Sequence, residues 1–193
     1  MTTHEYYNKN AKRFFEETLN LDMQHFYEPF LAMIPKQGKI LDAGCGSGRD
    51  SLYFKQNGYI VTAFDYCKKL ADLASEVIGQ EVLCLDFSEL SFKEEFDGIW
   101  ACASLLHVPK KSIDGILEKL SEALKTQGVL YASFKYGDRE TTERDRLFNN
   151  YTEETFVSLI NNHPYLKIIN TWKTEDVRED KKGKLWINIL VQK

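Results

Sequence analysis

Hydrophobic and polar positions first follow the period of a helix and later that of short buried strands. Near the N-terminus, mostly apolar residues recur at the i, i+4, i+7, i+8 spacing of one helix face and predict a helix from residue 3 to about residue 18: Tyr7, Ala11, Phe14, Phe15 and Thr18. The carboxylate of Asp22 can accept the free amides of a first turn, which predicts a second helix that runs to about Met33 and ends before Pro35. Two short helices are therefore expected to begin the chain.

From Gly38 onward, short apolar runs alternate with stretches of helical period. The apolar runs predict strands at residues 39–41, 60–64, 82–85, 99–103 and 129–134. The helical segments between them cover residues 49–57, 68–78 and 111–124, and each ends close to a glycine. Strands that are apolar without interruption are buried on both faces, which is typical of a parallel sheet covered by helices on either side.

The C-terminal part predicts one more helix, at residues 152–162, and two strands, at residues 166–172 and 185–191. The connection between these strands is charged, which favours an antiparallel pair at the edge of the sheet. No internal repeat, low-complexity segment or flexible linker interrupts the pattern. We therefore predict an α/β protein of one domain, with a helical cap at residues 1–35 and a core at residues 36–193.

Residues 135–150 depart from the alternation because they are rich in charge. Arg139, Arg144 and Arg146 alternate with Asp and Glu, which predicts a solvated loop of mixed charge rather than a phosphate-binding patch. The segment is too long and polar to be core, and such an insertion can close over a site as a lid.

Composition narrows the class of protein. The 193 residues carry 25 Lys and Arg against 29 Asp and Glu, a net charge of −4, and 43% of them are hydrophobic. This is the composition of an ordinary globular protein, and the acidic balance argues against nucleic acid as a partner. No N-terminal leader pattern and no apolar run of about 18 residues is present, so we expect a soluble, cytoplasmic monomer or homodimer with no membrane partner.

The cysteines give no sign of a metal site or a disulfide framework. They stand 17 to 22 positions apart, without a Cys-x-x-Cys pair or a nearby pair of histidines: Cys45, Cys67, Cys84 and Cys102. We expect buried, reduced thiols. Cys102 and His107 could form a nucleophile and its base, but a cysteine on a buried strand is more often inert packing.

The sharpest chemical signal is the run Ile-Leu-Asp-Ala-Gly-Cys-Gly-Ser-Gly-Arg-Asp at residues 40–50, where a strand enters glycines and then a helix. Glycines let the backbone turn tightly and approach a ligand, and the helix N-terminus offers free amides to a nucleotide-like or carboxylate-bearing ligand. The dinucleotide pattern Gly-x-Gly-x-x-Gly needs its last glycine where Arg49 stands. This departure counts against NAD or FAD.

The run closely resembles motif I of class I S-adenosylmethionine-dependent methyltransferases, and the resemblance extends over residues 38–134. Asp65 ends the second predicted strand about 20 positions beyond the first glycine, where the family has a carboxylate for both ribose hydroxyls. By the same resemblance, Asp86 faces the adenine amino group and Phe87 lies against the ring. Residues 96–109 are similar to the turn that faces the methyl group, and residues 124–130 match the Leu-Lys-x-x-Gly entry to strand five.

The resemblance implies a Rossmann-like, doubly wound sheet of seven mostly parallel strands in the order 3-2-1-4-5-7-6, with an antiparallel last strand and helices on both faces. It also implies S-adenosyl-L-methionine as cofactor, S-adenosyl-L-homocysteine as product and no metal. The cofactor-binding residues that it implies are Asp42, Gly44, Cys45, Gly46, Gly48, Arg49, Asp65, Tyr66, Asp86, Phe87, Cys102 and Ala103.

Within the family, the chain looks most like the small bacterial methyltransferases related to the tellurite-resistance and thiopurine type. Its compact size, the run Gly-Ser-Gly-Arg-Asp-Ser at residues 46–51 and the absence of an added target-recognition domain carry this likeness. The end of the fourth strand lacks the Asn-Pro-Pro-Tyr tetrad of many enzymes that methylate amino groups. We therefore expect a methyltransferase (EC 2.1.1.-) that acts on a small-molecule acceptor.

His107 is the candidate general base, since it follows the fourth strand and an imidazole titrating near pH 6.5 can take a proton at cellular pH. Its alternative role is packing or capping of a loop. The candidates for binding the acceptor are Tyr7, His107, Tyr136 and Arg146, with Trp186 and Asn188 as weaker ones. Tyr6 and Tyr7 fit core positions as well as ligand contacts.

Other functions remain open from the sequence. The chain could methylate a macromolecule such as tRNA or protein, or bind S-adenosylmethionine without catalysis as a sensor. An NAD-dependent oxidoreductase is a more distant alternative, because Arg49 replaces the last glycine of that pattern.

Overall fold

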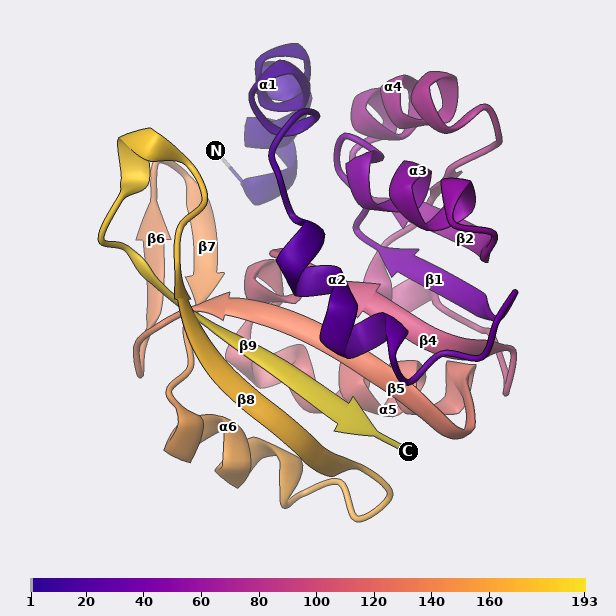
Figure 1. Cartoon of the computed structure of the whole chain (residues 1–193). Helices are drawn as coiled ribbons and strands as arrows, with labels where there is room; N and C mark the ends of the chain where they lie inside the picture. Colours follow the sequence, from indigo (N-terminus) through magenta and orange to yellow (C-terminus); the bar gives the residue numbers. More distant parts are fainter. Residues whose placement is uncertain (1) are drawn as a thin grey trace.

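The computed structural model describes residues 2–193 and has a twisted seven-stranded sheet at its centre (Figure 1). The strand order is β3-β2-β1-β4-β5-β9-β8; β1 to β5 run parallel, and β9 is antiparallel to both β5 and β8. The predicted order is confirmed, since β8 and β9 are the sixth and seventh strands of this sheet. The strands are β1 (Lys39–Ala43), β2 (Ile60–Asp65), β3 (Leu83–Cys84), β4 (Phe96–Ala101), β5 (Leu124–Lys135), β8 (Lys167–Glu175) and β9 (Leu185–Gln192).

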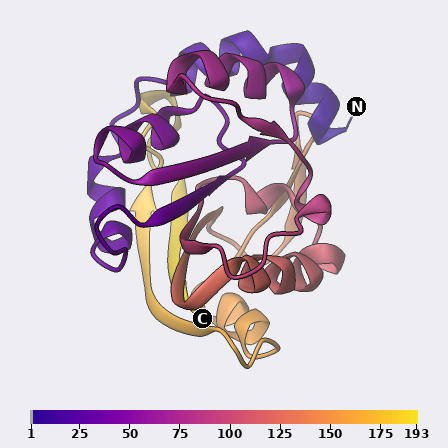
Figure 2. The same cartoon turned by 90° about the vertical axis from the view of Figure 1, so that its right-hand side faces the viewer.

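Helices cover both faces of the sheet, as Figure 2 shows with the N-terminal helices and α4 on one side and α5 and α6 on the other. The α-helices are α1 (Thr3–Thr18), α2 (Gln24–Leu31), α3 (Arg49–Gln56), α4 (Lys68–Ile78), α5 (Ile113–Ala123) and α6 (Glu153–Ile160). Apolar side chains of α5 and α6 pack on one face, and those of α2 and α3 on the other. On the second face Trp100 and Tyr131, opposite each other on β4 and β5, stack with their ring centroids 3.8 Å apart.

The N-terminal helix α1 starts at a capping box, in which the Thr2 hydroxyl accepts the Glu5 N–H and the Glu5 carboxylate accepts the Thr2 N–H. It packs its apolar stripe against α4, where Ala11, Cys67 and Leu70 form a small buried cluster. This contact holds α1 above the edge of the sheet at which β1, β2 and β4 end (Figure 1).

The second helix differs from its predicted bounds. Met23 is the cap residue, Asp22 accepts only the N–H of Gln24 at 3.0 Å, and α2 ends at Leu31 rather than near Met33. α2 contains Pro29 and, as predicted, ends before Pro35.

The charged segment at residues 135–150 is wrongly predicted as a solvated loop. It forms a hairpin of β6 (Glu140–Glu143) and β7 (Arg146–Asn149), with Arg144 and Asp145 in the turn at φ values of 50° and 64°. Two successive residues with positive φ make the turn type that matches strand twist in a two-residue hairpin. Arg139 and Arg144 are exposed, but Phe148 is buried, so one face of the hairpin joins the core.

The expectation of four buried thiols also fails. Cys67 is buried, Cys45 and Cys102 are half-buried, and Cys84 is exposed because it ends the two-residue edge strand β3. All four thiols are free. Within residues 2–193, no helix has both the length and the apolar character needed to cross a membrane.

Candidate functional site

A cavity of about 910 Å³ lies at the carboxyl ends of β1, β2 and β4. The sheet order reverses there, since β1 has β2 on one side and β4 on the other, and ligands of doubly wound proteins bind at such switch points. The volume is near the upper end of the range for ligand sites, about 300–1,000 Å³. Residues of the glycine loop, the ends of β2 and β3, the turn after β4, helix α1, the β6–β7 hairpin and the β8–β9 connection all line it.

The glycine loop shapes one wall of the cavity. Gly44 and Gly46 have φ values of +79° and +56°, in the left-handed region that favours glycine. A Cβ on Gly44 would stand 2.6 Å from the Cβ of Ser104, and one on Gly46 would stand 3.2 Å from the Phe14 ring. The loop therefore approaches both the turn after β4 and helix α1 as closely as a backbone without side chains permits.

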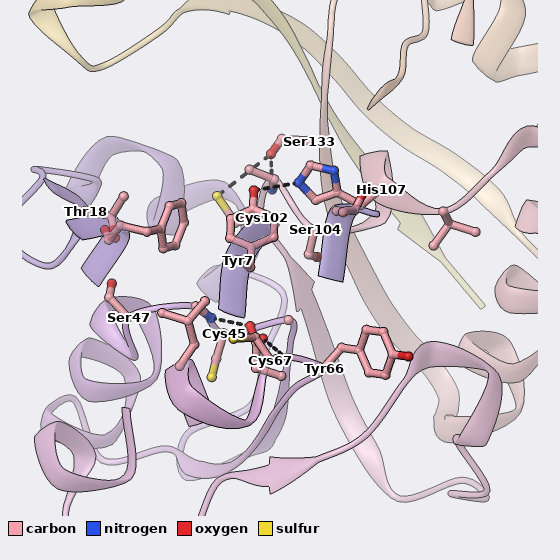
Figure 3. A pocket seen from close by; sticks show the side chains of 18 of the residues that line it. Tyr7, Thr18, Cys45, Ser47, Tyr66, Cys67, Cys102, Ser104, His107 and Ser133 are labelled. Carbon is pink, nitrogen blue, oxygen red and sulfur yellow. Dashed lines mark hydrogen bonds between the residues drawn. The ribbon is translucent and has the colours of Figure 1, made fainter. Parts of the chain in front are cut away.

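Asp65, at the end of β2, points its carboxylate into this cavity beside the loop. Its Oδ2 accepts the N–H of Gly46 at 2.9 Å and its Oδ1 accepts the N–H of Cys67 at 2.8 Å (Figure 3). Burial raises the pKa of Asp65, and the two amide donors act against that shift. Each carboxylate oxygen can accept more than one hydrogen bond, so Asp65 keeps the capacity to accept from a ligand hydroxyl.

Asp86 and Phe87, after β3, line the same cavity. Asp86 caps a short turn, where its Oδ1 accepts the N–H of Ser88 at 2.8 Å. Phe87 packs edge-on against Phe64 with centroids 5.2 Å apart. A flat aromatic surface and a carboxylate therefore stand together at this end of the cavity.

His107, in the turn after β4, contacts Tyr7 of α1 on the opposite wall of the cavity (Figure 3). Tyr7 Oη lies 2.8 Å from His107 Nε2, and His107 Nδ1 lies 2.7 Å from the carbonyl oxygen of Leu147 on β7. A carbonyl oxygen can only accept, so Nδ1 carries the proton and Nε2 accepts the Tyr7 O–H. The two hydrogen bonds fix the tautomer of the imidazole.

The prediction that His107 titrates near pH 6.5 is wrong in this setting. Burial lowers the pKa of His107 to about 4; the Leu147 carbonyl acts in the opposite direction, and the positive charges of Arg146 and Lys135 lower it further. Desolvation disfavours the charged imidazolium, and its neighbours on the hairpin and β5 carry the same charge. His107 is therefore neutral at cellular pH.

Comparison with known proteins places this geometry in a family. Residues 41–132 match the family model of a methyltransferase domain. The crystal structure of Burkholderia thailandensis 1,6-didemethyltoxoflavin-N1-methyltransferase, with 1,6-didemethyltoxoflavin and S-adenosylhomocysteine bound, has the same fold: TM-score 0.76 and 23% identity, covering 100% of this chain and 91% of that one.

Two relatives share sequence with the chain. TehB of Haemophilus influenzae (strain 10810), named as an S-adenosyl-L-methionine-dependent methyltransferase, is 26% identical over 162 residues, covering 72% of this chain and 57% of TehB. Residues 41–132 thus match a methyltransferase domain, and the chain resembles TehB. YqeM of Bacillus subtilis (strain 168), named as a methyltransferase, is 30% identical over 118 residues, covering 55% of this chain and 48% of YqeM. The chain thus spans about half the length of these relatives.

Most of the motif residues of this methyltransferase domain meet at the cavity. The cofactor candidates that line it are Gly44, Cys45, Gly46, Arg49, Asp65, Tyr66, Asp86, Phe87, Cys102 and Ala103. Asp42 and Gly48 are not in the lining. Asp42 is buried below the loop and accepts the Ser51 hydroxyl at 2.6 Å, and Gly48 caps α3, where a Cβ would press on Ala74 and Ile78.

Arg49 holds the methyltransferase loop to the N-terminal helices through Asp50. Its Nε donates to Asp50 Oδ1 at 2.6 Å, and its Nη1 donates to the Thr18 carbonyl at 3.3 Å. Asp50 also accepts from Tyr27 Oη at 2.7 Å and from Trp100 Nε1 at 2.8 Å. Burial acts to raise the pKa of Asp50, but the Arg49 guanidinium and these donors bring it below its ordinary value.

Two of the predicted acceptor-binding residues do not line the cavity. Tyr136 donates its hydroxyl to Glu153 at 3.0 Å. Arg146 stacks its guanidinium over the rings of Tyr6 and Phe148, with distances of 4.5 Å and 5.1 Å to the centroids. The other candidates, Tyr7, His107, Trp186 and Asn188, are in the lining.

Two groups of residues that line the cavity were not predicted from the sequence. The end of α1, the link after it and the start of α2 contribute Thr18, Leu21, Met23 and Phe26. The end of β8 and the β8–β9 connection contribute Thr174, Glu175, Asp176, Val177 and Arg178. In the second group, Asp176 accepts from Arg178 at 2.6 Å and from Trp186 at 3.1 Å. The Asp-x-Arg pair of Asp176 and Arg178 could have indicated an ordered turn in this charged stretch. No hydrophobic periodicity there indicated that the turn lines the cavity.

Proposed function

We propose that this chain transfers a methyl group from S-adenosylmethionine to a small-molecule acceptor. The observation that carries the proposal is the single cavity, because it contains Asp65 and the glycine loop on one wall and Tyr7 with His107 on another. Donor and acceptor need to meet within one enclosed space for an in-line displacement. The resemblance to TehB, named as an S-adenosyl-L-methionine-dependent methyltransferase, supports this activity.

The residues present fit the cofactor chemically. Asp65 has the acceptor capacity for ribose hydroxyls, and Phe87 offers an apolar ring for adenine. Gly44 and Gly46 line the same cavity, and their positive φ values let the loop turn tightly against Ser104 and Phe14. When bound, S-adenosylmethionine supplies a methyl group already activated by its sulfonium. The chain itself therefore has mainly to orient the two reactants and to exclude water.

Apolar side chains and helix α1 provide that exclusion. Leu21 and Met23 line the cavity from the α1–α2 link, Phe26 lines it from α2, and Ile116 lines it from α5. Two hydrogen bonds join α1 to the other side of the cavity: the Tyr7–His107 bond, and the bond at 3.0 Å in which Leu147 N–H donates to the Thr3 hydroxyl.

These bonds between α1, the turn after β4 and β7 support a small acceptor over RNA or protein, whose target group would need an open groove. The net charge of −4 supports the same choice, since RNA binding depends on a basic surface. A lid was expected at residues 135–150. In this proposal the β6–β7 hairpin and α1 together close the cavity, and both move when ligands exchange.

Binding and turnover test the proposal in sequence. S-adenosylhomocysteine should raise the melting temperature of the chain and NAD should not, because only a ligand of the native state adds RT ln(1 + [L]/Kd) to stability. Release of S-adenosylhomocysteine is then followed with a panel of small acceptors and with bulk tRNA. A shift with NAD but none with S-adenosylhomocysteine would overturn the cofactor assignment, and turnover on tRNA alone would overturn the acceptor class.

A further inference from the structure

In the hydrogen bond between Tyr7 and His107, the identity of the donor decides which of the two residues can interact with a methyl acceptor. His107 Nδ1 donates to the Leu147 carbonyl, so its single basic lone pair, on Nε2, already accepts the Tyr7 O–H at 2.8 Å. His107 therefore cannot take a proton from an acceptor directly while Tyr7 occupies that lone pair.

Tyr7 is left with lone pairs on Oη and no hydrogen to offer. Its hydroxyl proton is committed to His107, and the residue lines the cavity. A phenolic oxygen in this state can only accept a hydrogen bond from a further group. The part of the cavity next to Tyr7 is thus matched to a ligand atom that carries a hydrogen.

The surroundings hold the pair in this arrangement. Tyr7 packs edge-on against Phe14 with centroids 5.1 Å apart, and His107 lies 5.1 Å from the Phe148 ring. The charged groups that face the pair are Arg146 on the hairpin, Lys135 on β5 and Asp65 on β2. Rings fix the positions of both side chains, and the hydrogen bonds fix their protons.

We propose that Tyr7, oriented by His107, contacts the methyl acceptor and that the nucleophilic atom of this acceptor carries a hydrogen, as in a hydroxyl, an amine or a thiol. The inference rests on the proposed function and assigns the roles within it. Tyr7 is the catalytic residue that touches the acceptor, and His107 is a positioning residue that acts through Tyr7.

The proton and electron balance of the step is complete without another reactant. The acceptor's bond to hydrogen breaks, its electron pair forms the bond to the methyl carbon, and the carbon–sulfur bond breaks with its pair going to sulfur. The acceptor proton, which is hydrogen-bonded to Tyr7 Oη during the transfer, passes to water as the product leaves. Tyr7 keeps its own proton on the bond to His107 Nε2, and His107 stays neutral throughout.

The first test reads the geometry without any turnover. In a chain labelled with ¹⁵N at its four histidines, His107→Asn assigns the His107 signals. We expect the neutral Nδ1–H tautomer at pH 7, and an Nε2 shift that moves in Tyr7→Phe but not in the matched control Tyr6→Phe, which removes a hydroxyl one residue away on the same helix. An Nε2–H tautomer, or a charged imidazole at pH 7, would overturn the inference.

The second test compares acceptors with and without a hydrogen on the nucleophile. Phenol, aniline and 2-mercaptoethanol carry one and iodide does not; we expect turnover within the first group and a fall in kcat of at least about 100-fold in Tyr7→Phe. Tyr6→Phe should keep the wild-type rate, and S-adenosylhomocysteine affinity should be equal in all three proteins.

The outcomes separate this inference from the proposed function. Turnover of iodide alone, or a wild-type kcat in Tyr7→Phe on a hydrogen-bearing acceptor, would overturn the role of Tyr7 while leaving methyl transfer intact. Failure of the wild-type chain to bind S-adenosylhomocysteine would instead remove the proposed function.

Discussion

The depressed pKa of His107 predicts a pH-dependent loss of stability that can be measured without an acceptor. The pKa is about 4 in the folded chain and about 6.5 when the imidazole is free in water. Between pH 6.5 and pH 4, His107 binds a proton in the unfolded state but stays neutral in the folded state. His107 therefore leaves stability intact above pH 6.5 and reduces it progressively as the pH falls toward 4.

The size of the effect follows from the two pKa values. The unfolding free energy attributable to His107 falls by RT ln[(1 + 10^(6.5−pH))/(1 + 10^(4−pH))], which is about 2 kcal/mol at pH 5 and approaches about 3 kcal/mol below pH 4. A loss of this size is a large fraction of the stability of a domain, about 5–15 kcal/mol.

Urea unfolding of wild type and His107→Gln, at pH 7.5 and pH 5, isolates this contribution. All other titratable groups are the same in both proteins, so their effects cancel in the difference between the two. We expect the stability advantage of wild type over His107→Gln to shrink by about 2 kcal/mol between the two pH values. The control is His25→Gln, which replaces a histidine at an exposed position of α2.

A difference that stays constant for His107→Gln would refute the reasoning, because it would mean that His107 gains its proton as readily in the folded chain as in water. A growing advantage of wild type at pH 5 would mean that a negative group, rather than Arg146 and Lys135, dominates its surroundings.

Three substitutions test other parts of the structure. Asp65→Ala should weaken S-adenosylhomocysteine binding at least tenfold in calorimetry. A charge-assisted hydrogen bond contributes about 1.5–3 kcal/mol, and about 1.4 kcal/mol corresponds to a tenfold change in affinity. Equal affinities in Asp65→Ala and the exposed control Asp72→Ala would contradict the ribose role of Asp65. Gly44→Ala should lose more stability in urea than Gly58→Ala, because both have positive φ but only the former places its Cβ against a neighbour, at 2.6 Å; equal losses would contradict the close approach. Tyr27→Phe should cost about 1.5–3 kcal/mol of unfolding free energy, since it removes one donor to a buried carboxylate, and a loss below about 0.5 kcal/mol would show that the remaining donors suffice.

The sheet and the cofactor wall could be predicted because each depends on local pattern. Apolar runs bounded by glycines located the strands, and the run around Gly44 and Gly46 combined a strand end, positive φ values and a helix start within a few residues. The position of Asp65 at a strand end could be predicted from the pattern, whereas its ribose role came from the resemblance to the methyltransferase family. Such features need no knowledge of distant partners.

The acceptor wall could not be predicted in the same way because contacts between distant segments make it. The tautomer of His107 depends on Tyr7, 100 positions earlier, and on Leu147, 40 positions later. Its pKa depends on burial, on Leu147 and on the charges of Arg146 and Lys135. The hairpin around Arg146 looked like a polar loop because its charges obscure the alternation that buries Phe148. Charge density is a poor guide where guanidinium groups stack on aromatic rings instead of facing water.

The place of Trp186 gives the molecule a built-in optical reporter. The chain has three tryptophans. Trp100 is fully buried under its stacked tyrosine, whereas Trp186 lines the cavity with its indole N–H on Asp176. A compound entering from the β8–β9 side changes the polarity around Trp186 and leaves Trp100 in its dry surroundings, so emission spectra of a Trp172→Phe chain can rank unlabelled acceptor candidates by binding alone, before any product is identified.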